Sequence, residues 1–374
     1  MSLAPSPTEV APAMPGPRGR LRSRVSALSD SDVLRSPGPR RLVLVVGAYL
    51  GSLALFGLIV ASRGANPLGV FATMFHSTAL QSGSLQQVLL RAVPIALAAL
   101  AVAVPARAGL GNVGGEGQLI MGAVAATGVG VAIGNLVPGP LSWLLMALAG
   151  ALTGAAWAGI AGLLRTSLGA NEAVTTLLMN FVANDVMLYL IYQPWKDPTG
   201  SGQPQSRPLA SAARLPQLFG SQLDLGVLAA LVLAGGVWWL LRRTGWGFAL
   251  RIVGGNREAG RRAGLPVQRL LVSSMLVGGA LAGLGGMLNL AGLEFQLRPD
   301  ITLTFGYVAF LASWLGRHDP PKVVLAAVLF SAIAVSGNGL QLSYGLDGSV
   351  VDVLLALLVA APLVLSKGRK RALT

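Results

Sequence analysis

The chain has 374 residues, of which 53% are hydrophobic and 11% charged, and its mean hydropathy is +0.66. A soluble domain has about a quarter of its residues charged, so this composition excludes an ordinary soluble protein and indicates an integral membrane protein. The lack of cysteine excludes disulfides and thiol chemistry, and two distant histidines, His76 and His318, do not favour a zinc site. The net charge of +14 is informative only through its placement along the chain.

Composition divides the chain into three parts. The first residues are rich in Pro, Ser, Gly and Arg without an apolar period, which predicts a disordered cytoplasmic extension over 1–39. We expect a membrane domain over 40–366 and a basic cytoplasmic tail over 367–374. A helix rises about 1.5 Å per residue and a hydrocarbon core is about 30 Å thick. Ten apolar runs are therefore predicted to be transmembrane helices: 42–61, 88–106, 118–133, 141–164, 171–192, 223–241, 267–292, 301–315, 323–342 and 350–365.

Between the first two runs, 63–84 is predicted to be an external loop with a short amphipathic helix over 67–81. Pro94 and Pro105 are predicted to interrupt the second run, and 193–222 is the longest loop. Five runs in each half predict an all-α fold of two inverted repeats with broken helices, a common transporter plan. This expectation rests on the number of runs, because the halves share no evident sequence repeat.

The basic residues predict the orientation of these helices. Ten spans place both termini on one side, and most of the 28 Lys and Arg residues fall on that side. The positive-inside rule then places both termini in the cytoplasm. This topology accounts for the basic charge, so nucleic-acid binding is not expected.

Glycines concentrate between Gly109 and Gly117, where they enclose Asn112 and Glu116. Glycine costs roughly 1 kcal/mol relative to alanine inside a helix, so this segment predicts a helix that stops and restarts. The sequence has no Gly-x-x-x-x-Gly-Lys-Ser/Thr loop and no Ser/His/Asp arrangement, so neither ATP hydrolysis nor another enzyme activity is predicted. Asn112, Glu116 and Gln118 are expected either to fix the unwound backbone or to contact a solute.

The run 171–192 carries polar residues at every fourth position, namely Glu172, Thr176, Asn180 and Asn184. Asp185 lies directly after the last of them. This spacing forms a stripe that drifts slowly round one helix. A polar stripe in a membrane helix faces protein or water and not lipid. Two interpretations stay open, namely hydrogen bonding to a neighbouring helix and the lining of a polar route.

A second polar segment, 251–266, lies on the basic side. Asn256 is a favourable N-cap, Glu258 falls in the first turn, and Gly264 with Pro266 stops a helix. A short helix capped at both ends predicts a docking element, although an ordinary basic loop is the alternative.

Several motifs together resemble the permease subunits of bacterial ABC importers for nucleosides, within the wider branched-chain amino acid and simple-sugar permease family. The segment 112–118, NVGGEGQ, is similar to that family's N-I-G-x-E-G-Q motif, and 171–180, NEAVTTLLMN, to its N-E-V-I-S-T-x-M-L-N segment. The segment 255–265 resembles its coupling segment, and 315–317 with Pro320 also fits. Gly115 replaces the more usual small residue before the glutamate, which adds flexibility, and Gly260 stands where alanine is usual, which should weaken the coupling helix slightly.

The resemblance implies a subunit in the bacterial cytoplasmic membrane that works with a second homologous permease, a cytoplasmic ATP-binding-cassette ATPase and an extracellular substrate-binding lipoprotein. ATP and Mg²⁺ would be used by the ATPase, and this chain would bind no cofactor or metal. We expect a substrate pathway at Asn112, Glu116, Gln118, Thr176, Asn180 and Asn184. We expect ATPase coupling at Gly255, Asn256, Glu258, Ala259 and Gly264.

Nucleosides are the expected solute, and ribose, another sugar or a branched-chain amino acid is the nearer alternative. A secondary transporter driven by an ion gradient is a remote alternative. It would need a coupling carboxylate such as Asp185 or Glu116.

Overall fold

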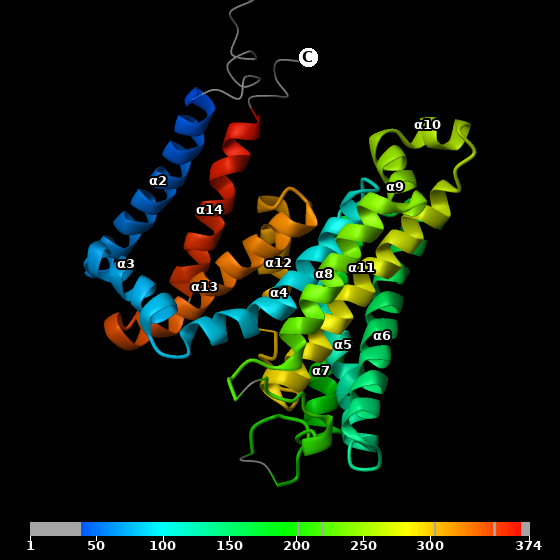
Figure 1. Ribbon diagram of the computed structural model, residues 1–374, viewed down its shortest axis with the longest axis horizontal. Helices are drawn as coiled ribbons and strands as arrows, with labels where there is room; N and C mark the ends of the chain where they lie inside the picture. The colour runs from blue at the N-terminus through cyan, green and yellow to red at the C-terminus, as the bar shows by residue number, and fades with distance from the viewer. Residues whose placement is uncertain (1–38, 200–201, 219, 303, 347–348, 368–374) are drawn as a thin grey trace, which may run out of the picture.

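The computed structural model describes residues 39–199, 202–218, 220–302, 304–346 and 349–367, and within these ranges the chain forms helices and no β-strand (Figure 1). Apart from Pro39 and Lys367, the predicted N-terminal extension and basic tail lie outside the described residues.

Each of the ten predicted runs contains a helix. In chain order these are α2 (Pro39–Ser62), α4 (Ser84–Ala106), α5 (Gly115–Ile133), α6 (Gly139–Ser167), α7 (Glu172–Tyr192), α8 (Leu225–Arg243), α11 (Val267–Asn289), α12 (Phe305–Leu315), α13 (Pro320–Tyr344) and α14 (Ser349–Lys367). Among the described residues, α4 to α8, α11 and α13 are long and apolar enough to cross a membrane, and α2 with the next helix forms a bent eighth candidate. The chain is therefore an all-α polytopic membrane protein.

Two expectations for these runs were wrong. Helix α4 is continuous through Pro94 and reaches Ala106, because membrane helices accommodate proline where neighbouring helices pack around them, and α4 is almost entirely buried. The run 301–315 is not a full span. Helix α12 begins at Phe305, so its 11 residues extend only about 16 Å, roughly half of the hydrocarbon core.

Three shorter α-helices and a 3-10 turn, Ser211–Ala213, also occur in the described residues. Helix α3 (Pro67–Phe75) continues into a π-helical turn, His76–Leu80, so the helix predicted over 67–81 is present. Its place in an external loop stays a prediction, because α3 and this turn together with α2 form the bent candidate span. Helix α9 (Gly245–Gly255) was not predicted, and α10 (Arg257–Arg262) is the short helix expected on the basic side. A second π-helical turn, Leu290–Glu294, extends α11.

The main core surrounds α11, which packs against α4, α5 and α6. Helices α6 and α11 meet backbone to backbone at Gly154 and Gly283, where an added Cβ would overlap the facing main chain. A second core joins α2, α3, α13 and α14 around Phe56, Leu340 and Val351. This second group lies to the left of the main bundle in Figure 1, and α13 connects it to α4.

The two halves share a packing order. Helices α5 and α6 pack together as α12 and α13 do, α5 contacts α7 as α12 contacts α14, and α6 packs on α11 as α13 packs on α4. This correspondence is what two structural repeats would produce. Their inverted orientation stays a prediction.

Basic residues collect at one end of the main bundle. Arg165 at the end of α6 pairs with Glu172 at the start of α7, and Arg107 and Arg242 both pair with Asp319 before α13. About 33 Å from Arg165 along α6, Trp143 donates to the carbonyl of Arg214 in the long loop. In Figure 1 the basic end, with α9 and α10, is at the top and this loop is at the bottom.

Candidate functional site

The main chain unwinds between α4 and α5. Helix α4 ends at Ala106 and α5 starts at Gly115, which confirms the predicted break. Gly109 adopts φ +72°, a conformation that other residues enter only at a cost. The N–H groups of 107–110 still donate to carbonyls at the end of α4. Those of Gly111, Val113 and Gly114 donate to side-chain acceptors instead.

Helix α7 supplies most of these acceptors from its polar stripe. Glu172 Oε1 accepts a hydrogen bond from Gly111 N at 3.2 Å, and Thr176 Oγ1 accepts one from Val113 N at 3.1 Å. Asn180 binds twice: its Oδ1 accepts from Gly117 N at 2.9 Å, and its Nδ2 donates to Val113 O at 3.0 Å. The stripe therefore holds the unwound main chain.

Asn112 and Gln118 complete this network from within the break. Asn112 Oδ1 accepts from Gly114 N at 3.0 Å and from Gln118 Nε2 at 2.9 Å. Asn112 Nδ2 donates to Ala101 O and to Gln118 Oε1, both at 3.1 Å. The exposed fractions of the two side chains are 0% and 1%, so in this conformation both ends of the Asn112 amide are used inside the protein.

Glu116 reaches a second break, which separates the turn Leu290–Glu294 from α12. Its carboxylate accepts from Thr302 Oγ1 and, at 2.6 Å, from Gly306 N. A carboxylate is stabilised at a helix N-terminus, where N–H groups are unpaired and the helix dipole is positive. Gly306 permits this approach, since a Cβ there would overlap the main chain of Glu116. The two breaks thus meet at one buried carboxylate.

Five of the six predicted pathway residues therefore lie together, and Asn184 does not join them. Asn184 is half-buried and makes no side-chain hydrogen bond to any residue that the structure describes, and Asp185 is exposed. Beyond Asn180 the buried face of α7 continues through Ala183 and Met187. A spacing of four residues advances about 40° per step on a helix of 3.6 residues per turn, which carries Asn184 off this face.

Sequence reasoning missed two polar residues at the second break. Thr302 binds Glu116, and Asn289 donates from Nδ2 to Ile301 O at 2.8 Å, while its buried Oδ1 has no partner among the described residues. An amide at the end of an apolar run was the available signal for Asn289. No local pattern indicated a role for Thr302, because its partner Glu116 lies far away in the sequence and is near it only in the folded chain.

The predicted coupling segment forms a capped helix. Asn256 Oδ1 accepts from Glu258 N and Ala259 N, both at 3.0 Å, so Asn256 caps α10. Gly264 adopts φ +76° just after the helix, and Gly255 is the last residue of α9. The exposed Glu258 pairs with Arg261 and Arg262 on the same helix.

This segment touches the first break directly. Arg257 Nη2 donates to the carbonyl of Gly109 at 3.1 Å. Gly254 lies so close to the main chain of Arg107 that an added Cβ would overlap its carbonyl oxygen. A displacement of α9 and α10 would therefore act on the unwound backbone. Hydrogen bonds from the polar side chains of α7 connect this backbone to α7, and Glu116 connects it to α12.

This chain is a polytopic helical bundle in which two helix breaks meet and a surface helix is attached. Such an architecture is typical of membrane transport proteins. Residues 84–362 match the family described as the permease component of the branched-chain amino acid transport system, and the chain belongs to that family. The chain is a permease subunit of the ABC type, as the sequence motifs indicated, which sets aside the ion-driven secondary transporter.

Three relatives show what this family contains. The glucose ABC transporter permease protein of Haloferax volcanii is 35% identical, over 86% of this chain and 88% of its own. The guanosine ABC transporter permease protein of Bacillus subtilis is 29% identical, over 85% of this chain and 91% of its own length. A nucleoside ABC transporter permease protein of Lactococcus lactis is 26% identical, over 86% of this chain and 90% of its own length.

Proposed function

We propose that this chain is the permease subunit of an ATP-driven importer and that it provides a path for nucleosides across the cytoplasmic membrane. The observation that carries the proposal is the direct contact between the coupling segment and the first helix break, through Arg257 and Gly109. An importer driven by a separate ATPase needs such a connection between the surface that the ATPase moves and the helices that open.

In this mechanism α10 sits in a groove of the ATPase, and Gly255, Asn256, Glu258, Ala259 and Gly264 set its shape and position. When ATP and Mg²⁺ close the ATPase dimer, α9 and α10 shift against the Arg107–Gly109 main chain. The network then moves α5, α7 and α12 together, and access changes from the outer to the inner side. This chain itself binds no nucleotide in the scheme.

The basic end of the bundle supports the proposed orientation. Arg107, Arg165 and Arg242 lie at that end with α9 and α10, and basic residues favour the cytoplasm. We therefore place α10 and both termini in the cytoplasm of a bacterial cell. The long loop 193–222 then faces outward, where a substrate-binding lipoprotein would deliver the solute.

A second permease is the expected neighbour in the membrane. Two nucleoside permease relatives of this chain come from one strain of Lactococcus lactis, which supports a pair of similar subunits.

Within the pathway, we assign Asn112, Gln118, Thr176 and Asn180 to holding the first break and Glu116 to joining the two breaks. Their polar groups are hydrogen bonded to the protein itself. Asn184, which has no such bond to a described residue, and the unpaired Oδ1 of Asn289 are the groups available to a ribose hydroxyl or a base edge.

Glucose is the second candidate solute, because the glucose permease of Haloferax volcanii is more similar to this chain than the guanosine permease is. Uptake of labelled guanosine by cells that carry the complete importer, in competition with unlabelled nucleosides, glucose, ribose or leucine, separates the candidates. Inhibition by nucleosides alone supports the proposal. No uptake of labelled guanosine, with uptake of labelled glucose in its place, would reassign the solute and leave the coupling scheme intact.

Coupling is tested by the substitution Gly264→Val, which forces a β-branched residue into a left-handed conformation. In the reconstituted complex we expect loss of uptake and of solute-stimulated ATP hydrolysis. Gly245→Ala is the control, because an added Cβ there meets nothing within 4 Å. Normal uptake by Gly264→Val would contradict the coupling role.

A further inference from the structure

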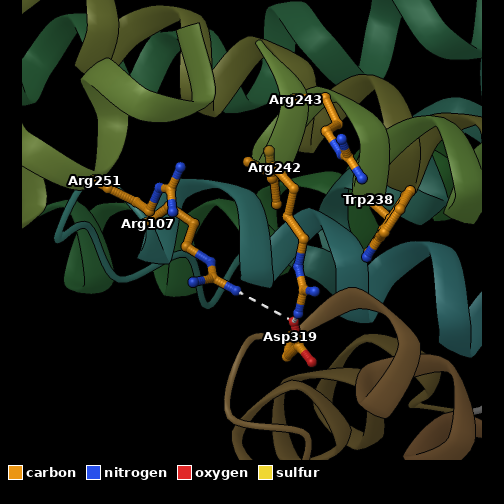
Figure 2. Close-up of a pocket in the computed structure, with 7 residues that line it drawn as sticks. Arg107, Trp238, Arg242, Arg243, Arg251 and Asp319 are labelled. Carbon is orange, nitrogen blue, oxygen red and sulfur yellow. Dashed lines mark hydrogen bonds and ion pairs between the residues drawn. The ribbon is translucent and has the colours of Figure 1, made fainter. Parts of the chain in front are cut away.

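A basic cavity of about 430 Å³ lies where the ends of α4 and α8 meet α9 and the start of α13. Figure 2 shows the guanidinium groups of Arg107 and Arg242 pointing toward Asp319, with Trp238 at one side. Arg243 and Arg251 also line the cavity. This volume falls in the range of small-molecule binding sites.

The cavity has more positive charge than the protein neutralises. Its single carboxylate, Asp319, lies 2.7 Å from Arg242 and 3.7 Å from Arg107. Arg243 and Arg251 form no ion pair with any residue that the structure describes, and the buried Nε of Arg107 has no hydrogen-bond partner there. Four guanidinium groups around one carboxylate, with donors left over, are complementary to an anion with several oxygen acceptors.

The position of the cavity indicates where that anion comes from. Trp238 and Arg242 belong to the last turns of α8, a candidate span that is mostly unburied by the rest of the chain. Tryptophan and arginine at the end of a membrane helix lie at the level of the lipid headgroups. Arg242 stacks over the Trp238 ring at 5.8 Å, which places an amphipathic pair at that boundary.

We propose that this cavity binds the phosphodiester headgroup of an anionic phospholipid, with Arg243 and Arg251 as its principal contacts. Basic pockets between membrane helices are suited to such headgroups. An acidic segment of a partner protein is less favoured, since the cavity opens between the ends of membrane helices and none of its lining residues belongs to α10. The proposal requires that α8 spans the membrane and does not rest on the identity of the transported solute.

The test measures lipid binding to the purified full chain in neutral detergent by native mass spectrometry, with phosphatidylglycerol and phosphatidylcholine as probes. The variant is Arg243→Gln with Arg251→Gln. Its control is Arg261→Gln with Arg262→Gln, which removes the same charge from exposed positions on α10. Equal melting temperatures of the two variants confirm that both are folded.

We expect the cavity variant to bind phosphatidylglycerol about 30-fold more weakly, because each arginine near a membrane surface contributes roughly fivefold. The control variant should bind it like the unmodified chain, and phosphatidylcholine should bind all three weakly. Equal phosphatidylglycerol binding by both variants would overturn the proposal. Displacement of the lipid by millimolar inorganic phosphate would also overturn it and identify a site for a soluble anion. In a parallel co-purification with the ATPase, loss of association by the cavity variant without a change in its lipid binding would overturn the proposal and assign the cavity to a partner protein.

Discussion

The two helix breaks reach similar unwound geometry from different residues. The first contains several glycines, with Gly109 at φ +72°, and its N–H groups bind side chains of α7. The second is bounded by Phe295 and Thr304, which adopt φ 59° and 66° although neither is glycine. Left-handed backbone costs such residues about 1–2 kcal/mol each. The first break is therefore locally permitted, whereas the second must be held by contacts from elsewhere in the chain.

Those contacts come from the long loop and from α5. Ser206 N donates to Leu297 O and Leu297 N donates to Ser206 Oγ, both at 2.9 Å. Leu209 N donates to Phe295 O at 2.7 Å. On the other side, Glu116 caps α12. The second break thus depends on the first through the carboxylate of Glu116. Substitutions at the two breaks should therefore lower the stability of the protein by different amounts.

The largest effect is expected for Glu116→Ala. It leaves the buried N–H of Gly306 and the hydroxyl of Thr302 without their acceptor, and hydrogen bonds to a charged group are worth about 1.5–3 kcal/mol each. We predict a loss of about 3 kcal/mol or more in the free energy of unfolding, measured by the melting temperature in detergent. Glu116→Gln keeps an acceptor oxygen and should lose less. An unchanged melting temperature for Glu116→Ala would show that the second break stands without the first.

Asn180→Ala should have the next largest effect. The substitution removes one donor and one acceptor from the backbone of the first break, and each unsatisfied buried group costs about 1–3 kcal/mol. We predict a loss of about 2–4 kcal/mol. Asn184→Ala, one turn along the same helix, is the matched control and should stay within about 0.5 kcal/mol. Equal melting temperatures for the two variants would contradict the network.

A smaller effect is expected at the glycines of the first break. Gly109→Ala places a Cβ on a left-handed residue and should cost about 1–2 kcal/mol. Gly111→Ala is the control, because its Cβ would make only an ordinary contact with Ala173 at 3.4 Å. Thermal unfolding of both variants checks this difference. A similar loss in both would mean that space, and not backbone conformation, selects glycine here.

The smallest effect concerns pH. Burial, together with the charge of Arg107, lowers the pKa of His318 in the turn between α12 and α13. The unfolded chain then binds more protons below the ordinary histidine pKa of about 6.5, so stability should fall as pH decreases from about 6.5 to the lowered folded-state value. His318→Gln should remove this part of the slope between pH 7.5 and 5.5. An identical slope in both proteins would exclude His318 as its source.

The contrast between the breaks also explains what the sequence could predict. Each of the ten apolar runs marked a helix, the glycines located the first break, and Asn256 marked the start of α10, because each feature is a local preference. No local feature such as a glycine cluster indicates the second break in the sequence. Thr304 and Phe295 are held by partners that only the folded chain brings near, so 301–315 was expected to be a full span. Helix α9 was missed because Gly245 and Gly247 weaken its local pattern, although Thr244 caps it.

The side-chain network had a similar limit. A spacing of four residues found Thr176 and Asn180, but it extended the stripe to Asn184, where the helical drift carries the side chain away from α5. Whether these polar groups hold the backbone or bind solute depends on which partners they meet, and a single sequence carries no information on those distances.

The most direct test of the account is the kinetics of guanosine uptake by Asn180→Ala in cells that carry the complete importer, together with the melting temperature of the same variant. If Asn180 holds the first break, the maximal rate should fall at least tenfold along with the melting temperature, while KM stays within about twofold. A KM raised tenfold or more with an unchanged melting temperature would show instead that Asn180 binds the solute, and would contradict the account.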